Sequence, residues 1–286
     1  MDKNPLVSVL MTAYNREQFI GEAIESVVNA TYSNWELIIV DDCSKDNTVC
    51  IAKLYESTDK RIKVYKNEKN LGDYPNRNKA ASYAKGKYIK YCDSDDKLFD
   101  WSLDYCVQTM EKFPEAGMGI LKLNKEVKQE YLLSKESIYT NFFKHPILSI
   151  GPSGTIIKRE SFEQIGGFNP GFGVASDMYF NLKMAAHFPL VLLSSVFFFY
   201  RTHEGQEVNN KYSYLYNNYR YLNQALVELP LDLSSEKIDW LKKKNKRRFI
   251  VNIFSYFFKS FNLKKTFSAV RKAEFSFKDV VQGIFH

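Results

Sequence analysis

Short apolar runs alternate with longer amphipathic segments over the first 120 residues of the chain. An uninterrupted apolar run of about four to eight residues is typical of a strand that is buried on both faces, and apolar positions spaced three and four apart indicate a helix packed on one face. The pattern predicts strands at residues 6–11, 36–40, 62–66, 87–92 and 117–123, separated by helices at residues 15–30, 46–57, 75–85 and 100–113.

This alternation predicts an α/β fold with a mostly parallel sheet, covered by helices on both faces and joined by right-handed crossovers. The pattern is less regular after residue 123, where a polar stretch is followed by an aromatic one. Beyond it we expect a strand at residues 155–158, a helix at 176–187, an apolar strand within 189–201, and helices over the remainder.

Carboxylates follow the predicted strands at the points where these strands end. Asp41 and Asp42 come directly after the second strand, and the run Asp93-Ser94-Asp95-Asp96 comes directly after the fourth. The carboxyl ends of parallel strands meet at one edge of a sheet, which is where ligands bind in such folds. Clustered carboxylates need compensating charge, and oxygen ligands suit Mg²⁺ or Mn²⁺ held together with substrate phosphates. The alternative is that these residues cap the next helix and are otherwise solvated.

Other nucleotide-binding and hydrolytic signatures are missing from the sequence. The sequence contains no GxxxxGK[ST] loop and no GxSxG motif. The segment VSVLMTAYNR, which includes the first strand and the turn after it, has no glycine and therefore no GxGxxG motif. The four cysteines lack zinc spacing. These absences argue against a P-loop NTPase, a dinucleotide-binding enzyme, an α/β-hydrolase and a structural zinc site.

Six segments in order resemble family 2 glycosyltransferases, which have the GT-A fold of nucleotide-diphospho-sugar transferases. The segments are VSVLMTAYNR, ELIIVDDCSKDNT, NLGDYPNRNKA, KYIKYCDSDD, GGFNPGF with ASDMYFNLK, and YRTH, and they span roughly residues 5–204. The resemblance implies an inverting transfer of a sugar from a nucleotide-diphosphate donor, most commonly a UDP-sugar, to a hydroxyl of a glycan or lipid-linked acceptor, as in bacterial surface polysaccharide assembly. A sugar nucleotidyltransferase and a nucleotide-sugar binding protein without activity are the alternatives.

The resemblance assigns nucleotide contacts to the ends of the first, second and fourth strands. Tyr14 would stack on the base, Asp42 would accept from a base N–H, and Arg77 would lie near the phosphates. The alternatives are a helix-entry role for Tyr14 and a surface helix charge for Arg77. The full set of nucleotide-binding residues predicted in this way is Thr12, Ala13, Tyr14, Asn15, Asp41, Asp42, Arg77, Asp93 and Ser94.

The same resemblance implies a divalent metal cofactor, Mn²⁺ or Mg²⁺. Asp95 is the residue expected to contact the metal directly, and Asp93 is expected to bind the ribose or the metal through water. His203, which follows the last strand of the sheet together with Arg201, is expected to reach the metal or the diphosphate as the following loop closes.

The resemblance places the catalytic base at the start of a late helix, where Asp177 matches the aspartate of a Glu-Asp pair. Asp177 is therefore predicted to take the proton from the acceptor hydroxyl. Ser176 stands where the family has the glutamate, so the positioning of the acceptor is expected to differ here. Gly154 lies on the acceptor side by analogy. The signature of processive synthases is not present, which favours the addition of a single sugar.

The net charge of +7 is unevenly distributed. Residues 211–286 carry 15 Lys or Arg and 6 Asp or Glu, which leaves the rest of the chain at a net charge of −2. We therefore predict a catalytic domain at residues 1–204 and a basic, aromatic helical extension at 205–286. The extension contains an apolar stripe that includes Ile250, Ile253, Phe254, Phe257, Phe258 and Phe261.

Three roles remain open for this extension: contact with an anionic membrane, packing on the catalytic domain, or docking in an oligomer. Because the basic charge is compact and no RNA or DNA motif is present, nucleic acid is not an expected partner. The start of the chain has no evident signal peptide. We therefore expect a cytoplasmic location, with peripheral attachment to the inner face of the membrane if the first role holds.

Overall fold

The computed structural model describes residues 4–122, 129–134, 136–204, 206, 210–273 and 275. Its centre is a mixed sheet with the strand order β3-β2-β1-β4-β8-β6-β9-β7. The eight strands are β1 (Val7–Ala13), β2 (Trp35–Asp41), β3 (Ile62–Lys66), β4 (Tyr88–Tyr91), β6 (Met118–Leu121), β7 (Tyr131–Leu133), β8 (Thr155–Lys158) and β9 (Leu190–Leu193). A small ribbon pairs β5 (Lys97–Leu98) with β10 (Phe198–Phe199) in antiparallel register.

The parallel half of the sheet is formed by β3, β2, β1 and β4, as the alternating pattern predicted. The remaining half departs from a parallel arrangement because β8 runs antiparallel to both β4 and β6, and β7 runs antiparallel to β9. The predicted α/β class with a mostly parallel central sheet is confirmed. β1 and β2 are apolar almost throughout because both faces of the sheet are covered.

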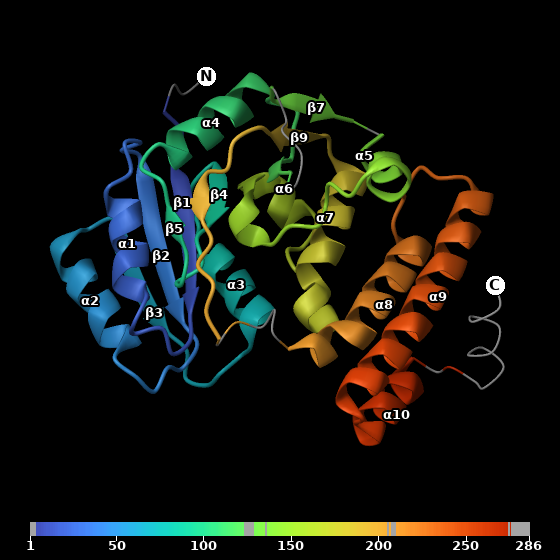
Figure 1. Ribbon diagram of the computed structural model, residues 1–286. Helices are drawn as coiled ribbons and strands as arrows, with labels where there is room; N and C mark the ends of the chain where they lie inside the picture. Colours follow the sequence, from blue (N-terminus) through green and yellow to red (C-terminus); the bar gives the residue numbers. More distant parts are fainter. Residues whose placement is uncertain are drawn as a thin grey trace.

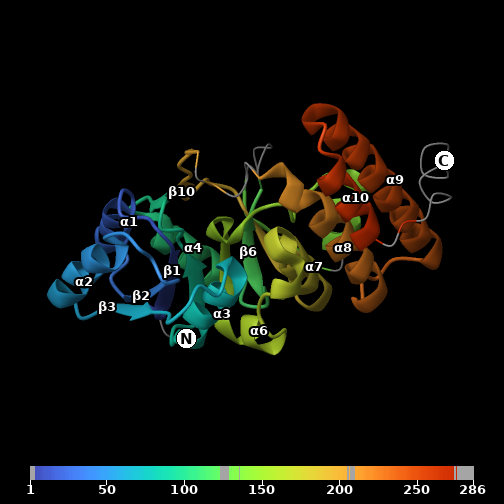
Figure 2. The same ribbon diagram turned by 90° about the horizontal axis from the view of Figure 1, so that it is seen from below.

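Helices cover the sheet on both sides (Figures 1 and 2). Right-handed crossovers place α1 and α2 on one face and α3, which returns from β3 to β4, on the other. The helices of this part are α1 (Ile20–Val28), α2 (Thr48–Thr58), α3 (Asp73–Ser82), α4 (Ser102–Lys112), α5 (Glu136–Tyr139), α6 (Arg159–Gln164) and α7 (Ser176–His187), with short turns of helix at η1 (Thr140–Lys144), η2 (Pro152–Gly154) and η3 (Pro170–Ala175).

Three further helices form the C-terminal extension: α8 (Lys211–Glu228), α9 (Ser235–Ser260) and α10 (Leu263–Lys272). They lie at the end of the molecule opposite α1 and α2 in both views (Figures 1 and 2). The extension shares the main hydrophobic core through Leu222, Ala225 and Leu226 of α8. Arg220 of α8 also donates to the Gly171 carbonyl of η3 at 2.8 Å.

The apolar stripe of the extension divides into two parts. Phe249, Ile250 and Ile253 are buried, and Phe249 and Ile253 form a second, small core with Ala269 of α10. Phe258 and Phe261, one and two turns further along, are 64% and 73% exposed. The stripe therefore packs on the protein in its first half only.

The packing of α8 gives a direct test of how the extension is joined to the body. Leu226 is 4% exposed within the main core, whereas its neighbour Val227 is 69% exposed. We expect Leu226→Ala to lower the free energy of unfolding by about 2–5 kcal/mol through lost burial and the cavity left behind, as measured by urea denaturation followed by circular dichroism. Val227→Ala is the matched control and should change stability by less than about 0.5 kcal/mol. Equal stabilities of the two variants would show that α8 is not part of the folded core.

Candidate active site

The first two loops of the sheet are tied together by side chains that bond to backbone N–H groups. Asn15 adopts a left-handed conformation with φ of 52°, and its N–H donates to Ser44 Oγ at 2.8 Å. The Arg16 N–H donates to Thr48 Oγ1 at 2.7 Å. Asp41 accepts from the Ser44 N–H at 2.9 Å and from the Ser44 hydroxyl. Because the left-handed backbone of Asn15 cannot form part of a right-handed helix, and residues 17–19 form a turn, α1 begins only at Ile20. The prediction of a helix from residue 15 was wrong at that end.

The residues at the end of β1 form one side of the site. Ser94, which is buried, donates its hydroxyl to the Thr12 carbonyl at 2.8 Å and so links the end of β4 to the end of β1. Ala13 is buried, whereas the Tyr14 ring is 45% exposed. A helix-entry staple would be packed away from solvent. The exposed ring therefore favours the interpretation of Tyr14 as a stacking platform.

Asp42 is buried and holds the loop that follows β3. Its Oδ1 accepts from Asn67 Nδ2 and from the Leu71 N–H, both at 2.8 Å. Its Oδ2 accepts from the Gly72 N–H at 2.8 Å. Gly72 has φ of +90°, a conformation that favours glycine. Asp42 thus shapes the loop before α3, a role that the sequence did not indicate.

Arg77 is buried and bridges two carboxylates. Its Nε lies 2.8 Å from Asp73 Oδ1, and one of its terminal nitrogens lies 2.7 Å from Asp93 Oδ1. The interpretation of Arg77 as a surface helix charge is wrong, because its side chain is only 9% exposed. Burial raises the pKa of Asp93, but the charge and hydrogen bond of Arg77 outweigh it and leave that pKa below its usual value.

One carboxylate oxygen of Asp95 is contacted by two nitrogen-containing side chains, the Arg16 guanidinium and the His203 imidazole. Its Oδ2 lies 3.2 Å from Arg16 Nε and 2.9 Å from His203 Nε2. The His203 ring also packs on Phe19 at a centroid distance of 4.8 Å. The structure therefore brings His203 to the predicted metal ligand, as expected from the sequence, and adds Arg16, which sequence reasoning missed.

Arg201 fastens the segment that carries His203. Its N–H donates to Asp96 Oδ1 at 3.0 Å, its Nε donates to the Asp95 carbonyl at 3.0 Å, and its terminal nitrogen donates to Glu22 at 2.9 Å. Burial, together with the nearby charge of Asp93, raises the pKa of Asp96 to about 7. Arg201 thus positions the segment and is not aimed into the site.

Asp177 lies in the first turn of α7, across from this acidic edge. It is half-buried, and its Oδ1 accepts from the Met178 N–H at 2.7 Å. Burial raises the pKa of Asp177 to about 7, although a backbone N–H, the charge of Arg77 and a hydrogen bond with Tyr74 act in the opposite direction. A carboxyl group with that pKa can accept a proton near neutral pH and release it again.

Two residues predicted on the acceptor side, Ser176 and Gly154, make contacts within the protein. Ser176 is fully buried, and its hydroxyl donates to the Gly173 carbonyl at 2.7 Å, so it holds the turn before α7. Gly154 is buried against Ile150, where a Cβ atom would lie 2.1 Å from Ile150 Cδ1. The glycine of this turn that borders Asp177 is Gly151, where a Cβ atom would lie 3.8 Å from Asp177 Oδ2.

Lys90 is a fully buried lysine beneath the site. Its Nζ donates to the Tyr91 carbonyl at 2.6 Å and to the Ser153 carbonyl at 2.5 Å, and lies 5.0 Å from the centre of the Phe197 ring. Burial lowers the pKa of Lys90. The lysine connects β4, which leads to Asp93, with the turn that borders Asp177. The signal in the sequence was a lysine inside an otherwise apolar strand.

The donor set fits a divalent metal only if the substrate supplies further ligands. In the part of the chain that the structure describes, no three His, Cys, Asp or Glu side chains form a group that could hold an ion. The Asp95 oxygen and the His203 nitrogen are 2.9 Å apart, which is close to the spacing of two neighbouring ligands on an ion with bonds of about 2.1 Å. Carboxylate and phosphate oxygens suit Mn²⁺ or Mg²⁺, whereas an imidazole nitrogen is more typical of transition metals and so favours Mn²⁺ of the two.

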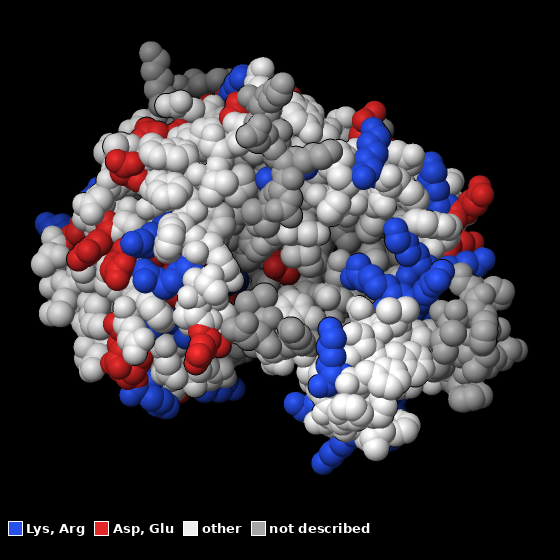
Figure 3. Space-filling view, viewed as in Figure 1, with Lys and Arg blue, Asp and Glu red and all other residues white. Residues whose placement is uncertain are grey.

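A hollow lies between the sheet and the helical extension on the face seen in Figure 3, and one acidic area is visible within it. The mixed sheet flanked by helices, with carboxylates directly after β2 and β4, has the architecture of the GT-A fold. The chain belongs to the Glycosyl transferase family 2, whose model matches residues 8–166.

Similar proteins support this assignment. TuaG of Bacillus subtilis, named as a teichuronic acid biosynthesis glycosyltransferase, is 35% identical over 166 residues, which cover 56% of this chain and 65% of TuaG. WfgD of Escherichia coli, named as a UDP-Glc:alpha-D-GlcNAc-diphosphoundecaprenol beta-1,3-glucosyltransferase, is 43% identical over 37% of this chain and 42% of its own length. The matches thus span less than two thirds of these relatives.

Solved structures share the fold over almost the whole chain. TarS 1–349 of S. aureus in complex with UDP-GlcNAc superposes with a TM-score of 0.72 at 20% identity, covering 97% of this chain and 81% of that one. The mannosyltransferase PcManGT of Pyrobaculum calidifontis in complex with GDP-Man and Mn²⁺ gives 0.64 at 16% identity, covering 98% and 79%. At these identities the likeness establishes the GT-A fold.

The three bonds to Asp42 lead to a prediction about stability. Asp42→Asn keeps the shape of the side chain but replaces one acceptor oxygen with an NH₂ group. That group would face either the Gly72 N–H or the N–H groups of Asn67 and Leu71, so that donor would meet donor. We expect the free energy of unfolding to fall by about 1–3 kcal/mol, the cost of an unpaired buried donor, in urea denaturation. Asp239→Asn, at an exposed position of α9, is the control and should leave stability unchanged. A stable Asp42→Asn variant would contradict the role of Asp42 in holding the loop.

Proposed function

We propose that this protein is an inverting, metal-dependent glycosyltransferase that moves one sugar from a nucleotide-diphosphate donor to a hydroxyl group. The observation that carries the proposal is Asp177, a half-buried carboxylate with a pKa of about 7. It is linked electrostatically to Asp93 through the buried Arg77. The charge of one guanidinium thus acts on both the proposed base and Asp93.

In the proposed reaction, the acceptor oxygen forms a bond to the anomeric carbon while the bond from that carbon to the diphosphate oxygen breaks. The proton of the hydroxyl goes to Asp177, and the electron pair of the broken bond leaves with the nucleoside diphosphate. One displacement of this kind inverts the configuration at the anomeric carbon. The half-buried setting of Asp177 keeps its carboxylate basic enough to accept the proton at neutral pH.

The donor is proposed to lie along the ends of β1, β2 and β4. Tyr14 would stack on the base, with Thr12, Ala13, Asn15, Asp41 and Asp42 shaping its pocket, and Ser94 and Asp93 would lie near the ribose. Asp95 and His203 would hold a divalent metal, which neutralises charge on the leaving diphosphate when bound. The solved neighbours bind UDP-GlcNAc or GDP-Man, and WfgD is named for UDP-Glc. These names favour a UDP-sugar.

The acceptor is proposed to be a hydroxyl of a glycan or of a lipid-linked saccharide in surface polysaccharide assembly. The names of TuaG and WfgD support this class of acceptor. Among the described residues, no helix is long and apolar enough to cross a membrane. We propose that the enzyme acts in the cytoplasm and contacts the inner face of the membrane through its helical extension.

The assignment of the base predicts a pH dependence. Because only the ionised carboxylate can accept a proton, kcat/KM should fall as the pH drops below about 7, the pKa of Asp177. Asp177→Asn should lower kcat by about 10²–10⁴-fold and abolish this acidic limb, measured as release of nucleoside diphosphate with donor and acceptor.

A stability measurement on Asp177→Asn shows whether its loss of rate comes from the lost base or from unfolding. A carboxyl whose pKa is raised in the folded state favours folding at low pH, and that contribution is lost as the pH rises through about 7. Asp177→Asn should therefore be at least as stable as the wild type at pH 8. The control Asp239→Asn should keep both the rate and the pH profile. Full turnover of Asp177→Asn would overturn the assignment of the base.

Metal binding can be measured without turnover. We expect UDP with Mn²⁺ to raise the melting temperature of the full chain more than UDP or Mn²⁺ alone, because ligands that bind only the folded state stabilise it. Asp95→Ala and His203→Ala should remove the Mn²⁺-dependent part of the shift. Glu115→Ala, at an exposed position, is the control. A Mn²⁺-dependent shift in the Asp95→Ala variant equal to that of the wild type would refute the metal assignment. A donor-binding protein that shows the shift without any transfer would be an inactive relative.

A further inference from the structure

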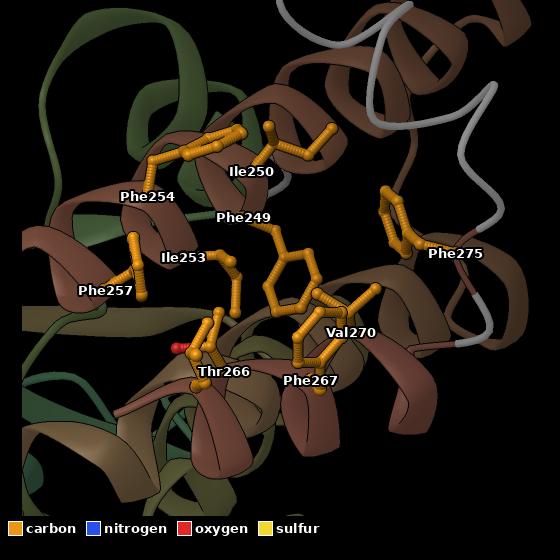
Figure 4. A pocket seen from close by; sticks show the side chains of 10 residues that line it. Phe249, Ile250, Ile253, Phe254, Phe257, Thr266, Phe267, Val270 and Phe275 are labelled. Carbon is orange, nitrogen blue, oxygen red and sulfur yellow. The ribbon is translucent and has the colours of Figure 1, made fainter. Parts of the chain in front are cut away.

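An apolar groove lies between α9 and α10, away from the proposed active site (Figure 4). Its volume is about 360 Å³. Phe249, Ile253 and Phe257 of α9 form one wall, and Phe267 and Val270 of α10 form part of the other. The polar side chain in the lining is Thr266, whose hydroxyl donates to the Asn262 carbonyl at 2.8 Å. The groove therefore presents hydrocarbon and aromatic surface without a hydrogen-bonding group left to a ligand.

The surface beside the groove is also apolar. Phe258 and Phe261 at the end of α9 and Phe267 in α10 are between 64% and 73% exposed. Large apolar side chains that lie together on the surface mark an interaction site. We call this corner, formed by Phe258, Phe261, Leu263 and Phe267, the aromatic corner.

Positive charge surrounds the groove and the aromatic corner. Residues 242–273 include 11 Lys or Arg and no Asp or Glu. Lys246 Nζ lies 5.4 Å from the centre of the Phe275 ring, which lines the groove, and Lys265 Nζ lies 5.1 Å from the Tyr212 ring. In Figure 3 Lys and Arg side chains lie above and to the left of an uncharged surface where α10 lies in Figure 1. The occupant must therefore combine an apolar body with negative charge.

This combination distinguishes among the partners that could cover the corner. A second copy of the chain would bring an equally cationic surface against the first one, and the like charges would repel. A polynucleotide would satisfy the charge but would leave the apolar groove empty. An anionic phospholipid has a hydrocarbon chain for the groove and a phosphate for the lysines, and exposed aromatic side chains favour the boundary between headgroups and acyl chains.

We propose that the groove between α9 and α10 binds one acyl chain of an anionic membrane phospholipid, while the aromatic corner enters the bilayer surface and the surrounding Lys and Arg side chains contact phosphate groups. The proposal goes beyond the transfer reaction and does not depend on it. It predicts two separable properties of the full chain: attachment to anionic vesicles, and immobilisation of a single lipid chain.

Vesicle sedimentation tests the first property. The full chain should bind vesicles of phosphatidylcholine with 30% phosphatidylglycerol at least tenfold more tightly than vesicles of phosphatidylcholine alone, and less tightly at high salt. Phe258→Glu together with Phe267→Glu should weaken binding at least tenfold. Leu54→Glu, which alters a 68% exposed apolar residue on α2, is the matched control and should bind as the wild type does. Equal binding to the two vesicle types, or equal binding by all variants, would overturn the proposal.

Charge reversal gives an independent arm of the same measurement. Lys259→Glu, Lys264→Glu and Lys272→Glu together change exposed positions on α9 and α10 and should weaken binding to the anionic vesicles at least tenfold. Lys60→Glu with Lys63→Glu, at exposed positions near the start of β3, is the control. A dimer in light scattering that the Phe258→Glu, Phe267→Glu variant abolishes would assign the corner to a second copy and overturn the proposal. The proposal would also be overturned if the wild type bound a single-stranded polynucleotide tightly and the triple Lys→Glu variant did not.

The groove itself is tested with phosphatidylglycerol that carries a spin label deep in one acyl chain. Adding the full chain to the vesicles should produce an immobilised component in the electron spin resonance spectrum. Val270→Phe, which fills the groove, should remove that component but leave sedimentation with the vesicles within twofold of the wild type. Thr266→Leu is a second filling variant in case the first one fails to fold. Vesicle binding without an immobilised component in the wild type would overturn the proposal that the groove takes a lipid chain.

Discussion

The arrangement of the site depends on the buried guanidinium of Arg77. The carboxyl ends of the parallel strands converge at one edge, so the acidic residues that follow them would repel one another without a cation between them. Arg77 supplies that cation through bonds to Asp73 and Asp93. The same charge acts on Asp177. One side chain of α3 therefore sets the electrostatic balance of residues from three parts of the sequence.

Bonds between loops provide the second level of organisation. Asn15 and Arg16 are fixed by Ser44 and Thr48, and the loop before α3 is fixed by Asp42. The His203 segment is fastened by Arg201 to the residues after β4. Segments that lie far apart in the sequence are thus held at one edge of the sheet by hydrogen bonds to backbone groups. Such bonds fix positions more tightly than contacts between mobile side chains.

Much of the fold and part of the site could be predicted from the sequence. The strands and the α/β class followed from the apolar pattern, because strands covered on both faces are apolar almost throughout. Short motifs singled out Asp93, Asp95 and Asp177 as candidate site residues, and the structure brings His203, another candidate, to Asp95. The predicted helix start at residue 15 was wrong because Asn15 adopts a left-handed conformation, which the apolar pattern does not reveal.

Contacts between distant residues could not be read in the same way. Arg16 lies 79 residues from Asp95 in the chain, and nothing in its neighbourhood distinguishes it from a surface arginine. Lys90 was visible as an oddity in a buried strand, but its partners are backbone carbonyls, which carry no sequence signal. The apolar stripe of α9 predicted an amphipathic helix correctly, yet only the fold decides that Phe249 is buried and Phe258 is exposed.

The double contact of Asp95 has a consequence for how the protein folds. Arg16 and His203 both contact one carboxylate oxygen of Asp95, and Arg77 forms an ion pair with Asp93. The acidic edge therefore carries its own counterions and can assemble without help from a metal. A cation that reaches Asp95 exchanges partners with a side chain of the protein, and does not neutralise a bare charge. If Asp95 binds the proposed metal, the affinity for that ion depends on how readily Arg16 and His203 give up the carboxylate oxygen.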